Sequence, residues 1–321
     1  MAISNIGSQL TLSSQLTTQS TQLGKLAEQL SSGVKNNDLT DYDATTAKQL
    51  INYNSQIAIR QGYLNSMTTV QSRLSEYDSI FTDLETVATN AQTLASSNTS
   101  YDSTKTASLT SQTTAYLKQV QDDLNQKLDG RYIFSGTRYS TQPVTDISTA
   151  TTTVSYPFTA TTSPTLPTYD ADYSASTTTS TPAFTQDTVV VDAGYSVTYG
   201  VTSNDSSIQK LVAGLQLLKQ AQSDTSATTY KTDMQNAATL LSDALSSLQA
   251  VHTSVAANIN LLKGETTLQN TNITNLQNEV SSLSSVDTAQ VSAEITALQT
   301  TLEASYSATG KILKLSLVNF L

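Results

Sequence analysis

The residue types that carry chemistry are sparse in this chain and are not grouped. Its 321 residues include one histidine, His252, and no cysteine. A single histidine cannot supply a pair of imidazole ligands, and a chain without cysteine has neither a disulfide nor a thiolate metal site. The spacings typical of nucleophile elbows, phosphate-binding loops and dinucleotide-binding turns are absent as well. We therefore expect no enzyme, no cofactor and no metal centre.

Three aspartates, Asp38, Asp41 and Asp43, are the closest group of possible cation ligands. Their spacing lacks the glycine and the closing glutamate of a calcium-binding loop. The interpretation that we favour is a solvated turn between two helices, and calcium binding is the alternative. His252 falls on a heptad seam described below, where packing between helices is a simpler role than ligation or catalysis.

Composition restricts the partners that the chain can bind. Lysine and arginine number 16 against 26 acidic residues, for a formal net charge of −10. Nucleic-acid binding needs clustered basic side chains that neutralise phosphates, so we expect no nucleic-acid partner. The chain has no apolar run of about 18 residues, and no basic segment followed by an apolar one at its N-terminus. We expect neither a membrane partner nor an ordinary signal peptide.

The elements that must position these residues are mostly helices. Hydrophobic residues are 37% of the chain, aromatic residues are 6%, and tryptophan is absent, which favours long, thin bundles over one thick core. All five prolines lie between Pro143 and Pro182. Since proline is poorly tolerated inside a helix, this grouping predicts helices, then an insertion, then helices again.

The clearest periodicity is in the C-terminal half, where thirteen positions alternate steps of four and three and ten of them are apolar. This spacing is typical of the a and d positions of a coiled coil. The positions are Leu241, Leu245, Leu248, His252, Val255, Ile259, Leu262, Thr266, Gln269, Ile273, Leu276, Val280 and Leu283. A second seam runs from Val291 to Ile312, after a break near Ser284-Ser285.

The remaining pattern predicts helices over residues 3–32, 44–96, 104–129 and 206–222, and one from about residue 228 to 284. Gly33 and Gly130 follow helix ends. Residues 132–134 are expected to form a short strand. Residues 188–191 and 195–201 are expected to form a hairpin whose turn is 192–194. The run from Thr149 to Thr181 is expected to face solvent, and O-glycan attachment is the alternative.

The fold class that we predict is mainly α. It is a long antiparallel coiled-coil helical bundle formed by both termini, with a small β-rich inserted domain. The predicted domains are a terminal coiled-coil domain (1–43 plus 285–321), a helical bundle domain (44–139 plus 205–284) and a variable β-rich insertion (140–204). Because the chain leaves and returns along helices, both termini are expected at one end.

Both ends of the chain are apolar, although chain ends are usually polar and frayed. We expect these ends to be buried against other molecules, as an assembly interface. Its predicted residues are Ile3, Ile6, Leu10, Leu16, Leu23, Leu26, Leu30, Ile295, Leu298, Leu302, Ile312, Leu315, Leu317, Val318, Phe320 and Leu321.

Four stretches resemble the flagellin superfamily, and most of all its hook–filament junction family, flagellar hook-associated protein 3. They are Leu30-Ser31-Ser32-Gly33, Gly130-Arg131-Tyr132-Ile133-Phe134-Ser135-Gly136, Ser285-Val286-Asp287-Thr288-Ala289 and the tail Ser316-Leu317-Val318-Asn319-Phe320-Leu321. The resemblance covers residues 1 to about 139 and about 205 to 321. The tail is the feature that favours the junction family over filament flagellins.

The resemblance implies a structural subunit of the bacterial flagellum. Its terminal helices would form an inner tube, and its insertion would face outwards. Its implied partners are further copies of itself in a helical ring, the first hook-associated protein, flagellin, and an export chaperone at the C-terminus. It would be exported by the flagellar type III apparatus to an extracellular location. The alternatives are a filament flagellin, or a flagellin-like surface protein that binds or displays carbohydrate.

Overall fold

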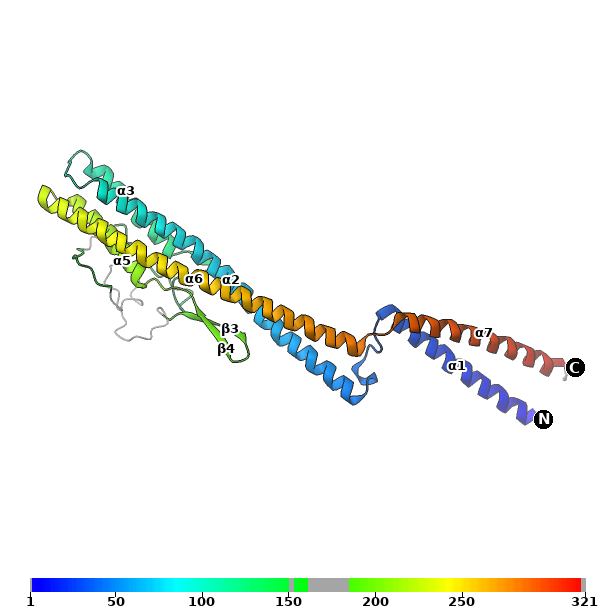
Figure 1. Cartoon of the computed structure of the whole chain (residues 1–321). Coiled ribbons are helices and arrows are strands. Elements are labelled where there is room, and N and C mark those ends of the chain that lie inside the picture. Colours follow the sequence, from blue (N-terminus) through cyan, green and yellow to red (C-terminus); the bar gives the residue numbers. More distant parts are fainter. Residues whose placement is uncertain (1, 150–152, 161–184, 319–321) are drawn as a thin grey trace. The chain divides into compact units, whose positions relative to one another are not determined.

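The computed structural model describes residues 2–149, 153–160 and 185–318, with side chains from residue 10 to residue 311 of these ranges. Two short hairpins and a 3-10 helix, η1 (Leu39–Asp41), accompany its helices. The predicted mainly α class with a small β-rich part is confirmed (Figure 1). The helices are α1 (Ala2–Ser32), α2 (Ala44–Ser97), α3 (Thr106–Leu124), α5 (Ser206–Ser223), α6 (Ala227–Ser284) and α7 (Thr288–Val318). The strands are β1 (Lys127–Leu128), β2 (Arg131–Tyr132), β3 (Asp187–Asp192) and β4 (Tyr195–Tyr199).

The chain forms two compact units, and each is described by itself. The first unit comprises residues 1–59 and 271–321, and the second comprises residues 60–270. Both divisions fall inside the long helices α2 and α6. The domain boundaries expected from the sequence fall at the loops, after residues 43 and 284, and that assignment stays a prediction.

Many helical positions are serine or threonine, and their hydroxyls are satisfied within the helices themselves. Thr17 donates to the carbonyl of Ser13 at 3.0 Å, and Thr21 donates to the carbonyl of Thr17 at 2.9 Å. The same bond to the carbonyl four residues earlier recurs along α2, α6 and α7. Because these hydroxyls already have partners, the helices can be rich in serine and threonine without further polar contacts.

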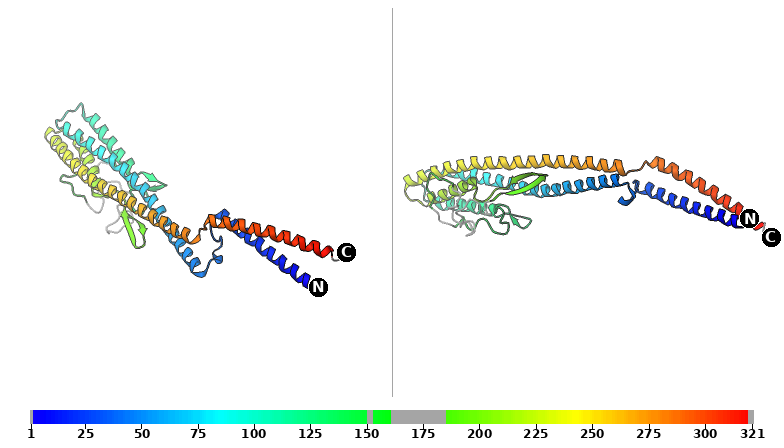
Figure 2. Two further views of the ribbon diagram at one scale, coloured as in Figure 1. Left: turned by 45° about the vertical axis from the view of Figure 1, so that its right-hand side comes forward. Right: turned by 90° about the horizontal axis from the view of Figure 1, so that it is seen from below.

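The core of the second unit lies between α2, α3, α5 and α6. Arg60 contacts Gln269 and Glu85 contacts His252, so α2 and α6 run antiparallel (Figure 2). α3 packs against α5, which is buried on all sides over most of its length. Every position of the predicted heptad seam on α6 is buried or half-buried. The largest fully buried side chains include Tyr230, Phe81, Phe134, Met67, Leu74, Ile80 and Leu84.

One predicted helix end is wrong. The helix expected to continue to Asp129 ends at Leu124, and Lys127-Leu128 pairs with Arg131-Tyr132 in a hairpin. Asp129 and Gly130 have φ angles of 51° and 77°. Two consecutive positive φ values are those of a type I′ turn, for which Asp-Gly is a preferred sequence. The second hairpin is as expected, with β3 and β4 joined at Ala193-Gly194.

Candidate assembly interface

The two terminal helices pack against each other within the first unit. α1 contacts α7, and the start of α1 and the end of α7 lie at the same end of this pair (Figures 1 and 2). Leu26 on α1 and Val291 and Leu302 on α7 are each no more than 7% exposed. The other described positions of the second seam, from Ile295 to Thr309, are half-buried. The four-and-three spacing of the second seam therefore corresponds to the contact between α7 and α1.

The ends of α1 and α6 are joined by backbone hydrogen bonds. The N–H of Lys35 donates to the carbonyl of Ser284 at 2.6 Å, and the N–H of Val286 donates to the carbonyl of Gly33 at 3.0 Å. Gly33 has a φ of 72°, which is the left-handed conformation expected after a helix. The Lys35 ammonium also donates to the carbonyl of Leu283 at 2.9 Å. This short antiparallel bridge fixes where α7 begins.

The aspartates of the turn serve as caps in the structure. Asp38 accepts from the N–H and hydroxyl of Thr40, and Asp43 accepts from the N–H groups of Thr45 and Thr46 at the start of α2. Bonds to Thr40 lower the pKa of Asp38, and bonds to Thr46 lower that of Asp43. No group of three potential metal-ligating side chains occurs among the described residues.

The predicted interface residues fall into three groups. Leu16, Leu23, Leu26, Ile295, Leu298 and Leu302 are buried or half-buried between α1 and α7. Leu10 and Leu30 remain 67% and 40% exposed. For the third group the structure describes no side chains. Six of these residues lie in the described backbone of α1 or α7: Ile3, Ile6, Ile312, Leu315, Leu317 and Val318. The other two, Phe320 and Leu321, lie outside the described residues.

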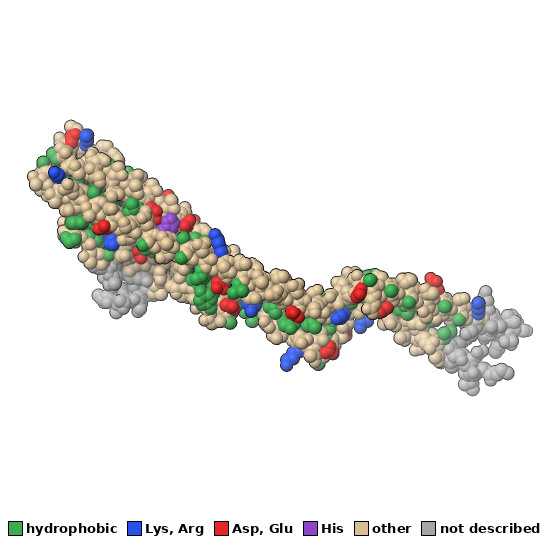
Figure 3. All heavy atoms as spheres, viewed as in Figure 1, with side chains coloured by type: hydrophobic (Ala, Val, Ile, Leu, Met, Phe, Trp, Pro, Cys, Tyr) green, Lys and Arg blue, Asp and Glu red, His purple; other side chains and the backbone are tan. Residues whose placement is uncertain are grey.

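A feature that the sequence-based reasoning missed is the lack of charge in most of α1. The segment from Ala2 to Gly24 contains no Asp, Glu, Lys or Arg. On α7, Tyr306 is 58% exposed and was not among the predicted residues. The visible face of the pair is mostly uncharged polar surface (Figure 3). A solvated helix usually carries charged side chains on its outer face, so a simple count of charges in α1 reveals this signal.

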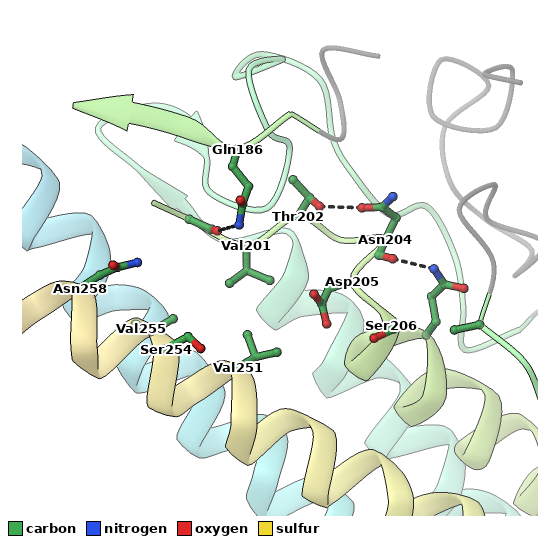
Figure 4. Close-up of a pocket in the computed structure, with 13 residues that line it drawn as sticks. Gln186, Val201, Thr202, Asn204, Asp205, Ser206, Val251, Ser254, Val255 and Asn258 are labelled. Carbon is green, nitrogen blue, oxygen red and sulfur yellow. Dashed lines mark hydrogen bonds between the residues drawn. The ribbon is translucent and has the colours of Figure 1, made fainter. Parts of the chain in front are cut away.

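A cavity near the second hairpin has a volume of about 610 Å³ and lies between the end of β4, the start of α5 and the middle of α6. Its polar side chains are largely bonded to one another or to nearby backbone (Figure 4). Thr202 donates to the side-chain oxygen of Asn204, and Gln186 donates to the carbonyl of Gly200 at 2.7 Å. Asp205 caps α5 through the N–H of Ser207. These bonds hold the loop that starts α5.

Among the described residues, none of the helices is both long and apolar enough to cross a membrane.

His252 lies on the α6 seam as expected from its spacing, but it is held by two carboxylates of α2 rather than by apolar packing alone. Sequence spacing placed His252 on the correct face but gave no information about the partner helix.

No family model matches the chain, and no curated protein matches it in sequence. Solved structures match it in fold. One, described as a flagellar hook-associated protein from Vibrio parahaemolyticus, is 12% identical with a TM-score of 0.56, and the match covers 76% of this chain and 100% of that one. FlgL from Bacillus cereus is 14% identical with a TM-score of 0.51, and the match covers 73% of this chain and 100% of that one. The chain therefore shares the fold of these two proteins.

Proposed function

We propose that the chain is a structural subunit of the bacterial flagellum that joins the hook to the filament, and that it polymerises through its N- and C-terminal helices. The observation that carries this proposal is the α1–α7 pair, with a charge-free stretch of α1 from Ala2 to Gly24 and exposed leucines. It occurs on a fold shared with two flagellar hook-associated proteins. The proposed role is structural, without catalysis.

The α1–α7 pair leaves part of its own surface uncovered. Two packed helices bury one seam and leave the other faces of both helices in solvent. Leu10 is 67% exposed although leucine gains roughly 1.5–3 kcal/mol from full burial. The cores of protein interfaces are depleted of charged residues, and α1 has none before Lys25. Neighbouring copies of the same pair would supply the missing contacts, because repeated head-to-tail contacts build helical assemblies.

The partners follow from the proposed position in the flagellum. Further copies of the chain would form a helical ring, with the first hook-associated protein on one side and flagellin on the other. A flagellar export chaperone would cover the apolar C-terminal segment before assembly. Export through the flagellar type III apparatus would deliver the chain to an extracellular site.

The alternative within the same architecture is a filament flagellin, and copy number distinguishes the two. We expect flagella sheared from cells to contain only enough copies of the chain for a short ring at the hook end, measured by quantitative mass spectrometry and immunogold labelling. Thousands of copies spread along each filament would overturn the junction assignment and leave the filament role. Complete absence from purified flagella would overturn the flagellar proposal itself.

A further inference from the structure

The only histidine of the chain is bonded on both sides by carboxylates. His252 Nδ1 lies 2.8 Å from Glu85 Oε1, and His252 Nε2 lies 3.0 Å from Asp78 Oδ1. His252 is on α6, whereas Asp78 and Glu85 are on α2. The two carboxylates are seven residues apart, about two helical turns, so they lie on one face of α2. The imidazole therefore bridges two positions along the partner helix.

The number of protons on the imidazole decides whether its contacts with Asp78 and Glu85 are both favourable. An ionised carboxylate only accepts hydrogen bonds, whereas a neutral imidazole has one donor nitrogen and one acceptor nitrogen. In the neutral form, one of the two carboxylates would face a nitrogen lone pair. The imidazolium form has two N–H donors, so it satisfies Asp78 and Glu85 together, and both bonds are then charge-assisted.

The surroundings of the ring hold it in this position. Its plane stacks on the ring of Phe81, with centroids 5.9 Å apart and an interplanar angle of 22°. The His252 and Glu85 side chains are each 22% exposed, so protons can exchange with solvent while screening is incomplete. The single histidine lies at the surface with acidic side chains beside it (Figure 3).

No other charged group competes at this site in the described structure. The charged groups that face the ring from α2 are Asp78 and Glu85. On α6, the residues three and four positions away are Leu248, Gln249, Val255 and Ala256, none of which is charged. Burial lowers the pKa of His252, but the hydrogen bonds and charges of Glu85 and Asp78 outweigh burial, and the net effect raises the pKa above 6.5.

We propose that His252 is a proton-dependent clamp between α6 and α2, which is closed when the imidazolium bonds Asp78 and Glu85 together and loosened when the proton leaves for solvent. The direction of the pH dependence follows from the linkage between proton binding and folding. A group whose pKa is higher in the folded chain stabilises it most fully below the unfolded value of about 6.5, and this stabilisation is lost as the pH rises through the folded value. The clamp is independent of the flagellar role.

The test uses the full chain and the fact that it has a single histidine. A ¹H–¹³C NMR titration can follow the Cε1–Hε1 group of the imidazole, which gives a single resonance in a chain with one histidine and needs no assignment by mutation. We expect wild-type His252 to titrate with a pKa above 6.5. Glu85→Gln and Asp78→Asn should each lower that pKa, and the double substitution should lower it further. Glu76→Gln is the matched control, because Glu76 is on α2 but about half a turn away from this face.

Urea unfolding provides the second readout. We expect the midpoint of the wild-type chain to exceed that of His252→Gln at pH 5.5, and this difference to shrink at pH 8.5. The proposal is overturned by a wild-type pKa at or below 6.5, by Glu76→Gln lowering the pKa as much as Glu85→Gln, or by a midpoint difference that is the same at both pH values.

Discussion

At the scale of single residues, Asp123 is an unfavourably placed carboxyl of the second unit. It is 7% exposed, and its Oδ2 has no hydrogen-bond partner in the described structure. Burial, together with the charges of Asp83 and Asp122, raises the pKa of Asp123 to about 6. The folded chain therefore resists ionising this group, and the cost to stability appears as the pH rises from about 4 through 6.

Asp123→Asn should remove that cost. We expect the variant to be more stable than the wild type at pH 8, by about 1–2 kcal/mol, and the difference to disappear as the pH falls towards 4. Urea unfolding at several pH values measures this difference in the free energy of unfolding. Asp243→Asn is the control, because Asp243 is an exposed aspartate of α6 whose charge is not among those that act on Asp123, and it should change stability little. A difference for Asp123→Asn that does not depend on pH would contradict this explanation.

Gly214 shows how closely α5 approaches α6. A Cβ placed there would lie 2.8 Å from Leu241 Cδ2 and 2.9 Å from Leu241 Cγ. We expect Gly214→Ala to destabilise the chain by about 1–3 kcal/mol, because the two helices must move apart. Gly264→Ala is the matched control on α6, since nothing lies within 4 Å of its Cβ position. The control should be neutral or stabilising by up to about 1 kcal/mol, and thermal unfolding compares the two.

At the scale of elements, the hairpin of β3 and β4 is anchored to the long helices by a polar network. Gln269 is fully buried, donates to the carbonyl of Val191 at 2.9 Å and accepts from Arg60 Nη1 at 2.7 Å. At the base of the hairpin, Arg73 Nη1 donates to the Tyr199 hydroxyl at 2.8 Å and lies 3.7 Å from Asp187 Oδ2. These contacts position a hairpin that is too small to be stable alone.

Gln269→Ala should loosen this hairpin without unfolding the helices. The substitution leaves the Val191 carbonyl and the Arg60 guanidinium without their buried partner, at a cost of about 1–3 kcal/mol. We expect faster amide hydrogen exchange over residues 187–199 and little change in the centre of α2. The control is Gln249→Ala, an exposed glutamine on the same helix. Equal exchange in the two variants would show that Gln269 does not hold the hairpin.

The helical elements could be predicted well from the sequence, because heptad spacing and proline placement are local signals. α6 begins at Ala227 against an expected start near residue 228, and α2 ends within one residue of the expected position. The predicted end of α3 was wrong because the leucine spacing was given more weight than the turn signal of Asp129-Gly130. Thr266 and Gln269 fit the seam as polar interruptions, but their bonds to Gln71 and Val191 depend on tertiary contacts that spacing cannot reveal.

The candidate interface could be predicted only in part. Periodicity identified the side chains that join α1 to α7, such as Leu26 and Leu302. It could not separate these from Leu10 and Leu30, which share the apolar character but remain exposed in the single chain. That distinction depends on which face of α1 meets α7, and this is decided by packing between segments almost 300 residues apart.

At the scale of the whole molecule, the buried core and the proposed assembly surface belong to different units. The second unit holds nearly all of the large buried side chains, whereas the first unit is built from pairs of helices. Deleting residues 313–321 should therefore abolish assembly while the second unit keeps its stability. Co-purification with flagella measures the first effect, and thermal unfolding measures the second. Normal incorporation of the truncated chain would contradict this division of roles.

The most direct test of assembly through α1 is a charge placed on its exposed face. Leu10 is 67% exposed, so Leu10→Glu should leave the fold and stability of the free chain unchanged, and Leu10→Gln provides a matched uncharged control. Burying the carboxylate in an assembled interface would be strongly unfavourable. The measurement is the amount of chain in flagella sheared from cells that express each variant. We predict at least about tenfold less Leu10→Glu than wild type, with the missing protein folded in the medium and Leu10→Gln affected less. Incorporation of Leu10→Glu at the wild-type level would contradict the account.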